Sequence, residues 1–131
     1  MLGYVMIGAD DVPGSGRFYS AILGPLGYDR KDDGHGIVFS RPDTPDVYVV
    51  RPFDGRSATV GNGSMLAFRA AAHALVRTLH AAGIAAGGRD EGAPGFRADY
   101  SEHFYVAYLR DPVGNKLALF CNDPAEGRRG A

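Results

Sequence analysis

The chain has 131 residues, of which 45% are hydrophobic and 22% are charged, and its formal net charge is −1. This length suits one domain, spanning 1–131, with a core large enough to fold without a disulfide or a structural metal. The near-neutral charge excludes the basic surface that binds nucleic acid or anionic membranes, so we expect small molecules as partners.

The chain opens with a mostly apolar run, Met1–Ala9, that predicts the first strand. This run is too short for a membrane span, and no basic segment precedes it. The single cysteine, Cys121, excludes an intrachain disulfide and favours a reducing compartment. We therefore predict a cytoplasmic protein.

Residues 12–16, VPGSG, predict a turn, and residues 17–23, RFYSAIL, predict an amphipathic helix. The apolar residues of this helix recur at spacings of three and four: Phe18, Tyr19, Ile22 and Leu23. Gly24 and Pro25 are typical of the residues that stop a helix.

Two short strands are predicted next, HGIVFS at 35–40 and DVYVVR at 46–51. A segment rich in Pro and Asp separates them. Residues 53–64, FDGRSATVGNGS, carry no periodic apolar pattern and are rich in glycine. We interpret this segment as the connection between two halves of the chain.

The second half begins with a predicted strand at 64–70, SMLAFRA, and a predicted helix at 70–83. The buried stripe of this helix is predicted to consist of Leu75, Val76 and Leu79. Gly83 is predicted to end the helix, and a polar, glycine-rich region covers residues 84–100.

Three histidines lie away from any predicted core. His73 and His80 are seven residues apart on the second helix, on the face opposite its apolar stripe, so we expect them to face solvent. His35 lies in a glycine-rich loop or at the start of a strand. None of the three is predicted to bind a metal.

The two halves share one order, which is a strand, a helix and then shorter strands. This pattern predicts an α+β fold of two modules, 1–55 and 61–122, followed by a disordered tail at 123–131. One helix cannot cover the sheet of either half alone, so we expect the two halves to pack together.

The segment FYVAYLRDPVGNKLALF predicts a hairpin with a tight turn. The Asp111 side chain can accept from the amides that follow it, and the next Pro and Gly suit the turn geometry. If Arg110 pairs with Lys116, Tyr108 lies opposite Ala118 and the alternation of the strands is fixed. The side chains of the second strand that face the helices are then Leu117, Leu119 and Cys121.

Four segments together resemble the vicinal oxygen chelate superfamily, which includes glyoxalase I, extradiol dioxygenases and bleomycin-resistance proteins. They are RFYSAILGPLGY, GNGSMLAF, PGFRADY and YVAYLRDPVGNKLALF, in the order that the family shows. The resemblance covers nearly the whole chain. It implies two paired βαβββ modules that form a cupped mixed sheet with helices on the outer face, and it implies a homodimer.

Members of this superfamily that bind metal supply two histidines and one glutamate, and the resemblance places those ligands at Tyr4, Met65 and Ala118. A catalytic divalent site takes about three protein donors, commonly imidazole and carboxylate groups. Phenol, thioether and methyl groups do not form such a set. We therefore predict no metal and no other cofactor.

Without a metal, an apolar and aromatic cup is expected to bind a flat, partly apolar ligand, although the same side chains could simply fill a core. The inner face is predicted to carry Tyr4, Met6, Met65, Ala67, Arg69, Tyr108, Ala118 and Phe120.

The resemblance also places the loop around Arg97 and Tyr100 across the cup mouth. There Arg97 either binds an anionic group of the ligand or pairs with Asp99 or Glu102. His103 enters the next strand, in a structural or a functional role. The predicted ligand-binding residues are thus Tyr4, Met65, Arg97, Tyr100, His103, Tyr108, Ala118 and Phe120.

Three functions remain open. The first is a metal-free small-molecule-binding protein, similar in role to bleomycin-resistance proteins. The second is an enzyme, a glyoxalase-like lyase, isomerase or dioxygenase that uses a metal or takes its acid–base groups from His103, Glu102 or Tyr4. The third is a protein whose main role is association with a partner chain. We favour the first.

Overall fold

The computed structural model describes residues 1–131. The first half of the chain contains β1 (Tyr4–Gly8), α1 (Val12–Leu23), β2 (Asp29–Asp32), β3 (Gly36–Ser40) and β4 (Asp46–Val50). The second half contains β5 (Leu66–Arg69), α2 (His73–Ala85), β6 (Arg89–Phe96), β7 (Tyr105–Arg110) and β8 (Lys116–Cys121), and a 3-10 helix, η1 (Pro124–Glu126), follows.

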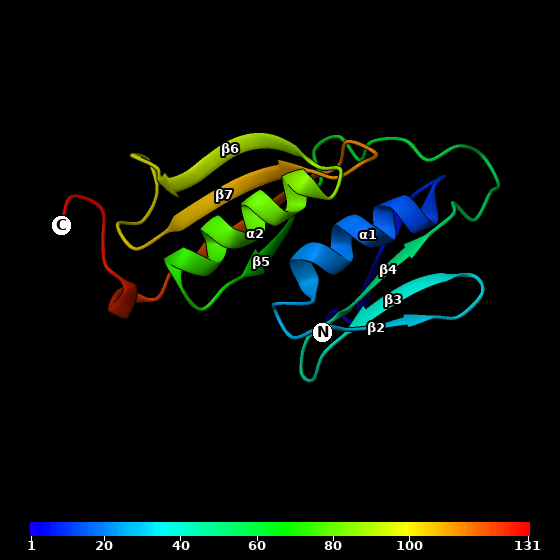
Figure 1. Ribbon diagram of the computed structural model, residues 1–131, viewed down its shortest axis with the longest axis horizontal. Coiled ribbons are helices and arrows are strands. Elements are labelled where there is room, and N and C mark those ends of the chain that lie inside the picture. The colour runs from blue at the N-terminus through cyan, green and yellow to red at the C-terminus, as the bar shows by residue number, and fades with distance from the viewer.

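The two halves have the same topology. Their sheets have the strand orders β1-β4-β3-β2 and β5-β8-β7-β6. In each sheet the first strand pairs in parallel with the last, and the other pairs are antiparallel. Figure 1 shows α1 and α2 side by side in one layer, with the sheets behind them. The predicted α+β fold of two βαβββ modules is confirmed.

Helix α1 begins earlier than the sequence predicts. The segment VPGSG is its first turn, because the Asp11 side chain accepts from the Gly14 amide at 3.0 Å and Pro13 is tolerated at this position. Gly16 lets the end of the Ile37 side chain on β3 pack closely against this turn. The prediction of a turn at 12–16 is therefore wrong.

Helix α2 continues past Gly83, so the predicted stop is also wrong. Gly83 lies where this helix meets α1 and β7, and a Cβ atom there would be 2.7 Å from Leu109 and 3.2 Å from Ile22. The glycine lets the two helices approach closely. The helix ends at Ala85, and Gly87, two residues later, has a φ of 105° that suits a glycine.

The core lies between the helices and one face of each sheet. It includes Leu117, Leu119 and Cys121, as the predicted alternation of β8 requires. Val76 and Leu79 of α2 are fully buried in the same core. We call the opposite faces of the two sheets, turned away from the helices, the cup faces.

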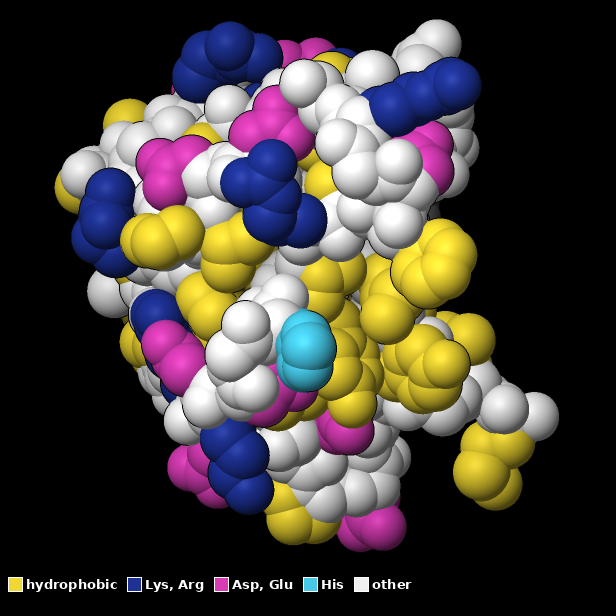
Figure 2. Space-filling model, turned by 90° about the vertical axis from the view of Figure 1, so that its right-hand side faces the viewer, with side chains coloured by type: hydrophobic (Ala, Val, Ile, Leu, Met, Phe, Trp, Pro, Cys, Tyr) yellow, Lys and Arg dark blue, Asp and Glu magenta, His cyan; other side chains and the backbone are white.

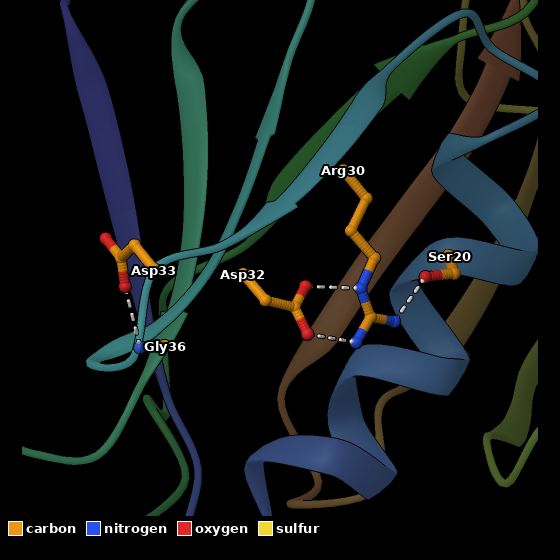
Figure 3. Close-up of polar contacts among 5 residues, drawn as sticks. All are labelled: Ser20, Arg30, Asp32, Asp33 and Gly36. Atoms are coloured by element: carbon orange, nitrogen blue, oxygen red, sulfur yellow. Dashed lines mark hydrogen bonds and ion pairs between the residues drawn. The ribbon is translucent and has the colours of Figure 1, made fainter.

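The predicted βαβββ modules imply two more strands, but the sequence pattern did not locate β2 and β6. All four residues of β2 are exposed, and Arg30 ties the strand to α1 by donating to Ser20 Oγ at 2.9 Å while it pairs with Asp32 at 2.9 Å (Figure 3). The Asp33 side chain accepts from the Gly36 amide at 3.0 Å and closes the turn to β3. Because β2 buries no residue, it has no apolar alternation for a sequence pattern to detect.

Strand β6 is hidden by its glycines. It pairs with β7 through two register shifts, on either side of Gly92. A Cβ atom at Gly92 would be 2.8 Å from the Tyr108 ring, so the glycine makes room for that side chain. The predicted polar region at 84–100 is thus the end of α2 followed by a bulged strand.

The cup face of the first module is open. Tyr4 and Met6 of β1 expose 59% and 63% of their surface. Figure 2, which views the end of the molecule that the first module forms, shows hydrophobic side chains gathered on one side of it. Neither α1 nor α2 combines the length and hydrophobicity needed to cross a bilayer.

Candidate ligand-binding cup

The β7–β8 hairpin has the predicted register. Arg110 lies opposite Lys116, Tyr108 opposite Ala118, and Val106 opposite Phe120. Alternation therefore places Tyr108, Ala118 and Phe120 on the cup face of the second module.

Asp111 holds the turn of this hairpin. Its Oδ1 atom accepts from the amides of Val113, Gly114 and Asn115 at 2.9–3.0 Å. Its Oδ2 atom accepts from the Tyr19 hydroxyl of α1 at 2.6 Å. Burial, and next the Asp111 charge, raise the pKa of the Tyr19 phenol well above 10.0. One buried carboxylate therefore joins the site hairpin to the helix of the other module.

The three positions that the resemblance assigns to metal ligands do not fit a metal. Ala118 is 1% exposed and offers only a methyl group. Tyr4 packs its ring edge against Tyr48, with the centroids 5.4 Å apart, and Met65 is 47% exposed. No three His, Cys, Asp or Glu side chains lie close enough together to hold a metal ion. The donor set of a catalytic divalent site is missing from these residues.

Aromatic side chains line the cup face of the second module. The rings of Phe104 and Phe120 have centroids 5.3 Å apart, and those of Tyr100 and Phe104 are 5.7 Å apart. Partial burial first, and the neighbouring Tyr100 phenol second, raise the pKa of Tyr108. Tyr100, Phe104 and Phe120 form a row of contacting rings, and the Lys116 ammonium lies 4.6 Å from the centroid of the Tyr108 ring beside them. Such a row suits a flat ligand. Phe104 was not among the predicted ligand-binding residues, although it directly precedes β7 and alternation places it on the same face as Tyr108.

Arg97 organises this wall. Its Nη2 atom donates to the Ala93 carbonyl at 2.8 Å, and its Nη1 atom donates to Gly95 and Phe96 carbonyls. Its guanidinium carbon lies 5.5 Å from the centroid of the Tyr108 ring. It makes no ion pair with Asp99 or Glu102. The guanidinium is largely occupied by its own strand, which leaves few of its donors for a ligand.

The C-terminal tail holds the segment between β6 and β7 in place. Arg129 Nη1 donates to the carbonyls of Arg97 and Tyr100 at 2.9 and 2.8 Å, and the Arg129 amide donates to the Glu102 carbonyl at 2.7 Å. Glu126 accepts from the His73 amide at the start of α2, at 2.8 Å. The tail thus connects the aromatic wall to α2.

His103 belongs to this tail contact. Its Nδ1 atom lies 3.2 Å from the Gly127 carbonyl, and its Nε2 atom lies 3.6 Å from Glu102. These contacts connect it with the tail and with its chain neighbour.

The sequence predicted that His73 and His80 face solvent, and this prediction is wrong. His80 is 8% exposed and its Nε2 atom lies 3.0 Å from Asp90 of β6. The backbone amide of Gly92 first, and His80 second, lower the pKa of Asp90. His73 stacks on Tyr105 with centroids 4.2 Å apart. Strand β6 curls beside α2 and covers this helix face, which the prediction could not include because it lacked the strand.

Two cavities lie where the modules meet. The smaller, about 270 Å³, lies between β1 and β5 and is lined by Met65 with Met6, Tyr19 and Lys116 among others. The larger, about 680 Å³, includes Phe120, Arg69 and Arg41. Of the predicted ligand-binding residues, only Met65 lines the smaller cavity and only Phe120 the larger. Tyr4 lines neither.

Solved structures with the same fold are numerous. A glyoxalase/bleomycin resistance protein from Albidiferax ferrireducens T118 is 38% identical in sequence, with a TM-score of 0.84 over 94% of this chain and 99% of that chain. A glyoxalase/bleomycin resistance protein/dioxygenase family enzyme from Burkholderia phytofirmans PsJN is 21% identical, with a TM-score of 0.74 over 92% and 98%. Lactoylglutathione lyase from Agrobacterium tumefaciens is 18% identical, with a TM-score of 0.63 over 92% of each chain.

A scan against models of known protein families finds no match, and a search of the curated proteins finds none either. The similarity to the Albidiferax protein extends over nearly all of both chains, and the two more distant structures share its fold. The order of elements, the hairpin register and the sequence identity all indicate the same family. The chain belongs to the glyoxalase/bleomycin resistance protein family of the vicinal oxygen chelate superfamily.

Proposed function

We propose that the protein binds a small aromatic or partly apolar molecule on the cup face of its second module, without a metal. The observation that carries this proposal is the aromatic wall on the second module, together with the replacement of the ligand set by Tyr4, Met65 and Ala118. Ala118 is 1% exposed and lies opposite Tyr108, so its position is covered by neighbouring side chains and presents no ligating group. Such a surface gains binding energy by burying the apolar area of the ligand.

A fluorescence titration tests the proposal. The probe is N-phenyl-1-naphthylamine, a neutral aromatic that becomes bright in apolar sites, and the protein is treated with EDTA and dialysed. We expect saturable binding of one probe per chain, weakened about tenfold or more in Tyr108→Ala, because one aromatic contact and its apolar area are lost. Tyr48→Ala, on the first module, is the matched control. No saturable binding, or equal loss in both variants, contradicts the proposal.

An enzyme of the same family is the second candidate, favoured by the pair of His103 and Glu102 beside the cup wall. It would be a glyoxalase-like lyase, isomerase or dioxygenase, and these two side chains would supply acid–base groups. Elemental analysis of protein purified without chelators tests its metal-dependent form. One transition metal per chain supports that form, and a metal-free protein with no turnover of α-ketoaldehyde adducts or catechols removes it.

We also propose a homodimer, and the open cup face of the first module supports it. Tyr4, Met6 and Leu2 expose large apolar surfaces that a second copy would bury. Light scattering after size exclusion should give twice the mass of one chain, and Met6→Lys should shift it toward one. A wild-type monomer at high concentration contradicts this part of the proposal. The cytoplasmic location remains a prediction from the sequence.

A further inference from the structure

The larger cavity, of about 680 Å³, is a cleft between the modules with an unusual charge pattern. One wall comes from the turns that follow α1 and β3, and the other from β5, β8 and the start of α2. No Asp or Glu lines it, but two arginines do, Arg41 from the first module and Arg69 from the second. Its size lies within the range of small-molecule sites.

Arg69 contacts an aromatic ring but has no polar partner in the protein. It lies opposite Phe120 in the pairing of β5 with β8, and its guanidinium carbon is 5.6 Å from the centroid of that ring. Its guanidinium makes no hydrogen bond or ion pair with the protein. Arg30 and Arg110, by contrast, pair with Asp32 at 2.9 Å and with Glu91 at 3.1 Å.

Arg41 is held on the opposite wall. Its Nη1 atom donates to the Leu26 carbonyl at 2.7 Å, and its guanidinium carbon lies 5.9 Å from the centroid of the Tyr28 ring. These two contacts fix the side chain and leave its other nitrogen atoms available. A planar guanidinium fixed in this way is well suited to bind an oxyanion.

We propose that this cleft binds the oxyanion of an amphipathic ligand, a carboxylate, sulfonate or phosphate, between Arg41 and Arg69. The apolar part of the ligand packs against Phe120, Leu26 and Leu75, which line the same cleft. The inference deepens the proposed function and rests on it in part, since Phe120 belongs to both surfaces. It names the ligand class as an aromatic or apolar anion and assigns its charge to Arg69, because Arg97 is occupied by carbonyls of its own strand.

Two fluorescent probes that differ only in charge test this inference. 8-Anilinonaphthalene-1-sulfonate carries a sulfonate that N-phenyl-1-naphthylamine lacks. We expect the sulfonate to bind at least about tenfold more tightly, because it can form charge-assisted hydrogen bonds with the two guanidinium groups and the neutral probe cannot. Arg69→Gln and Arg41→Gln should each remove most of this preference and leave the affinity for the neutral probe within about twofold.

Arg17→Gln is the matched control, because Arg17 is an exposed arginine that lines neither cavity. It should leave both affinities unchanged. Thermal unfolding of each variant checks the fold, and Arg69, which makes no hydrogen bond, remains diagnostic even if loss of the Arg41 bond to Leu26 destabilises the chain.

The outcomes separate the inference from the proposed function. Equal affinities for the two probes, or a preference that survives Arg69→Gln, overturn the inference while leaving the neutral ligand site intact. Binding of the sulfonate alone, abolished in Arg69→Gln, supports the inference and counts against a neutral aromatic ligand in the cup.

Discussion

In the first module Val38 and Tyr48, on the cup face of the inner strands β3 and β4, are only half-buried. In the second module Val106 and Ala118, on the inner strands β7 and β8, are 0% and 1% exposed on the corresponding face. The topology is the same, so the difference comes from the side chains. The aromatic side chains of Phe104, Tyr108 and Phe120 flank the two buried residues, whereas the cup face of β3 and β4 carries only one aromatic residue, Tyr48. This difference supports the proposals that the first sheet binds a partner chain and the second a ligand.

The covered module also depends on long-range contacts that the open module lacks. Its hairpin turn is tied to α1 through Asp111, and the segment before β7 is tied to the tail through Arg129. In the first module the outer strand β2 is tied by Arg30, which pairs with Asp32 and donates to Ser20 of α1, over a shorter stretch of the chain. The site is therefore expected to be the more rigid region, and each of the following variants tests one of its ties.

Asp111→Ala should have the largest effect. It removes a buried acceptor of five hydrogen bonds, to three turn amides, the Asn115 side chain and the Tyr19 hydroxyl. We expect the free energy of unfolding to fall by about 4 kcal/mol, because buried donors are left unsatisfied. Urea unfolding measures this. Asp29→Ala, at an exposed residue of β2, should change it by less than about 0.5 kcal/mol, and equal losses would show that Asp111 is not the tie between modules.

Gly83→Leu should have the next largest effect. The new side chain has no space between α2, Leu109 and Ile22, so the helices must separate. Overpacking of this kind costs about 2–3 kcal/mol. The same substitution at Gly3, where no atom lies within 4 Å of an added Cβ, is the control and should be nearly neutral. A tolerated leucine at position 83 would contradict the close helix packing.

Tyr19→Phe should cost about 1 kcal/mol, since it removes one hydrogen bond to a buried carboxylate. It should also change the response to alkali. The raised pKa of Tyr19 means that its contribution is fully present below about pH 10 and is lost as the pH rises, because the unfolded chain releases the proton first.

Thermal unfolding between neutral pH and pH 11 measures this response. The wild type should lose stability more steeply above pH 10 than Tyr19→Phe. Parallel curves for the two proteins would mean that the phenol is not buried against Asp111.

Arg129→Ala should have the smallest effect on stability, less than about 1 kcal/mol, because the residue is at an exposed terminus. It should instead loosen the segment around Arg97 and Tyr100, weaken binding of the neutral probe by about threefold, and speed proteolysis there. Arg128→Ala is the control, since Arg128 makes only an exposed contact of 3.9 Å with Glu102. If the tail is disordered in solution, as the sequence predicts, both variants will digest like the wild type.

The parts of the fold that local patterns describe were predictable. The DPVGN turn and the alternation of β8 gave the register of Tyr108 with Ala118, because turn chemistry and a period of two fix a hairpin. Strand β6 was missed because it lacks apolar alternation, and its Gly92 makes room for the Tyr108 ring on the neighbouring strand. Gly83 was misassigned for the same reason, because its role depends on Leu109 and α1, which are distant in sequence.

The site was predictable only in part. Alternation indicated Arg69 on the inner face, but no sequence pattern could show that its guanidinium has no partner or that Arg41 lies across a cleft from it. The ties to Arg129 and Glu126 join segments about 30 and 50 residues apart along the chain, and they involve exposed charged side chains that lack periodicity. Such contacts appear only once the fold is known.

A crystal grown with cobalt chloride and 6-bromo-2-naphthol, measured at the anomalous edges of both elements, tests the central claim most directly. We predict a bromine peak beside Tyr108 and Phe120 and no cobalt peak beside Tyr4, Met65 and Ala118. A cobalt ion coordinated at those three residues, or a cup without bromine, would contradict metal-free binding of an aromatic ligand.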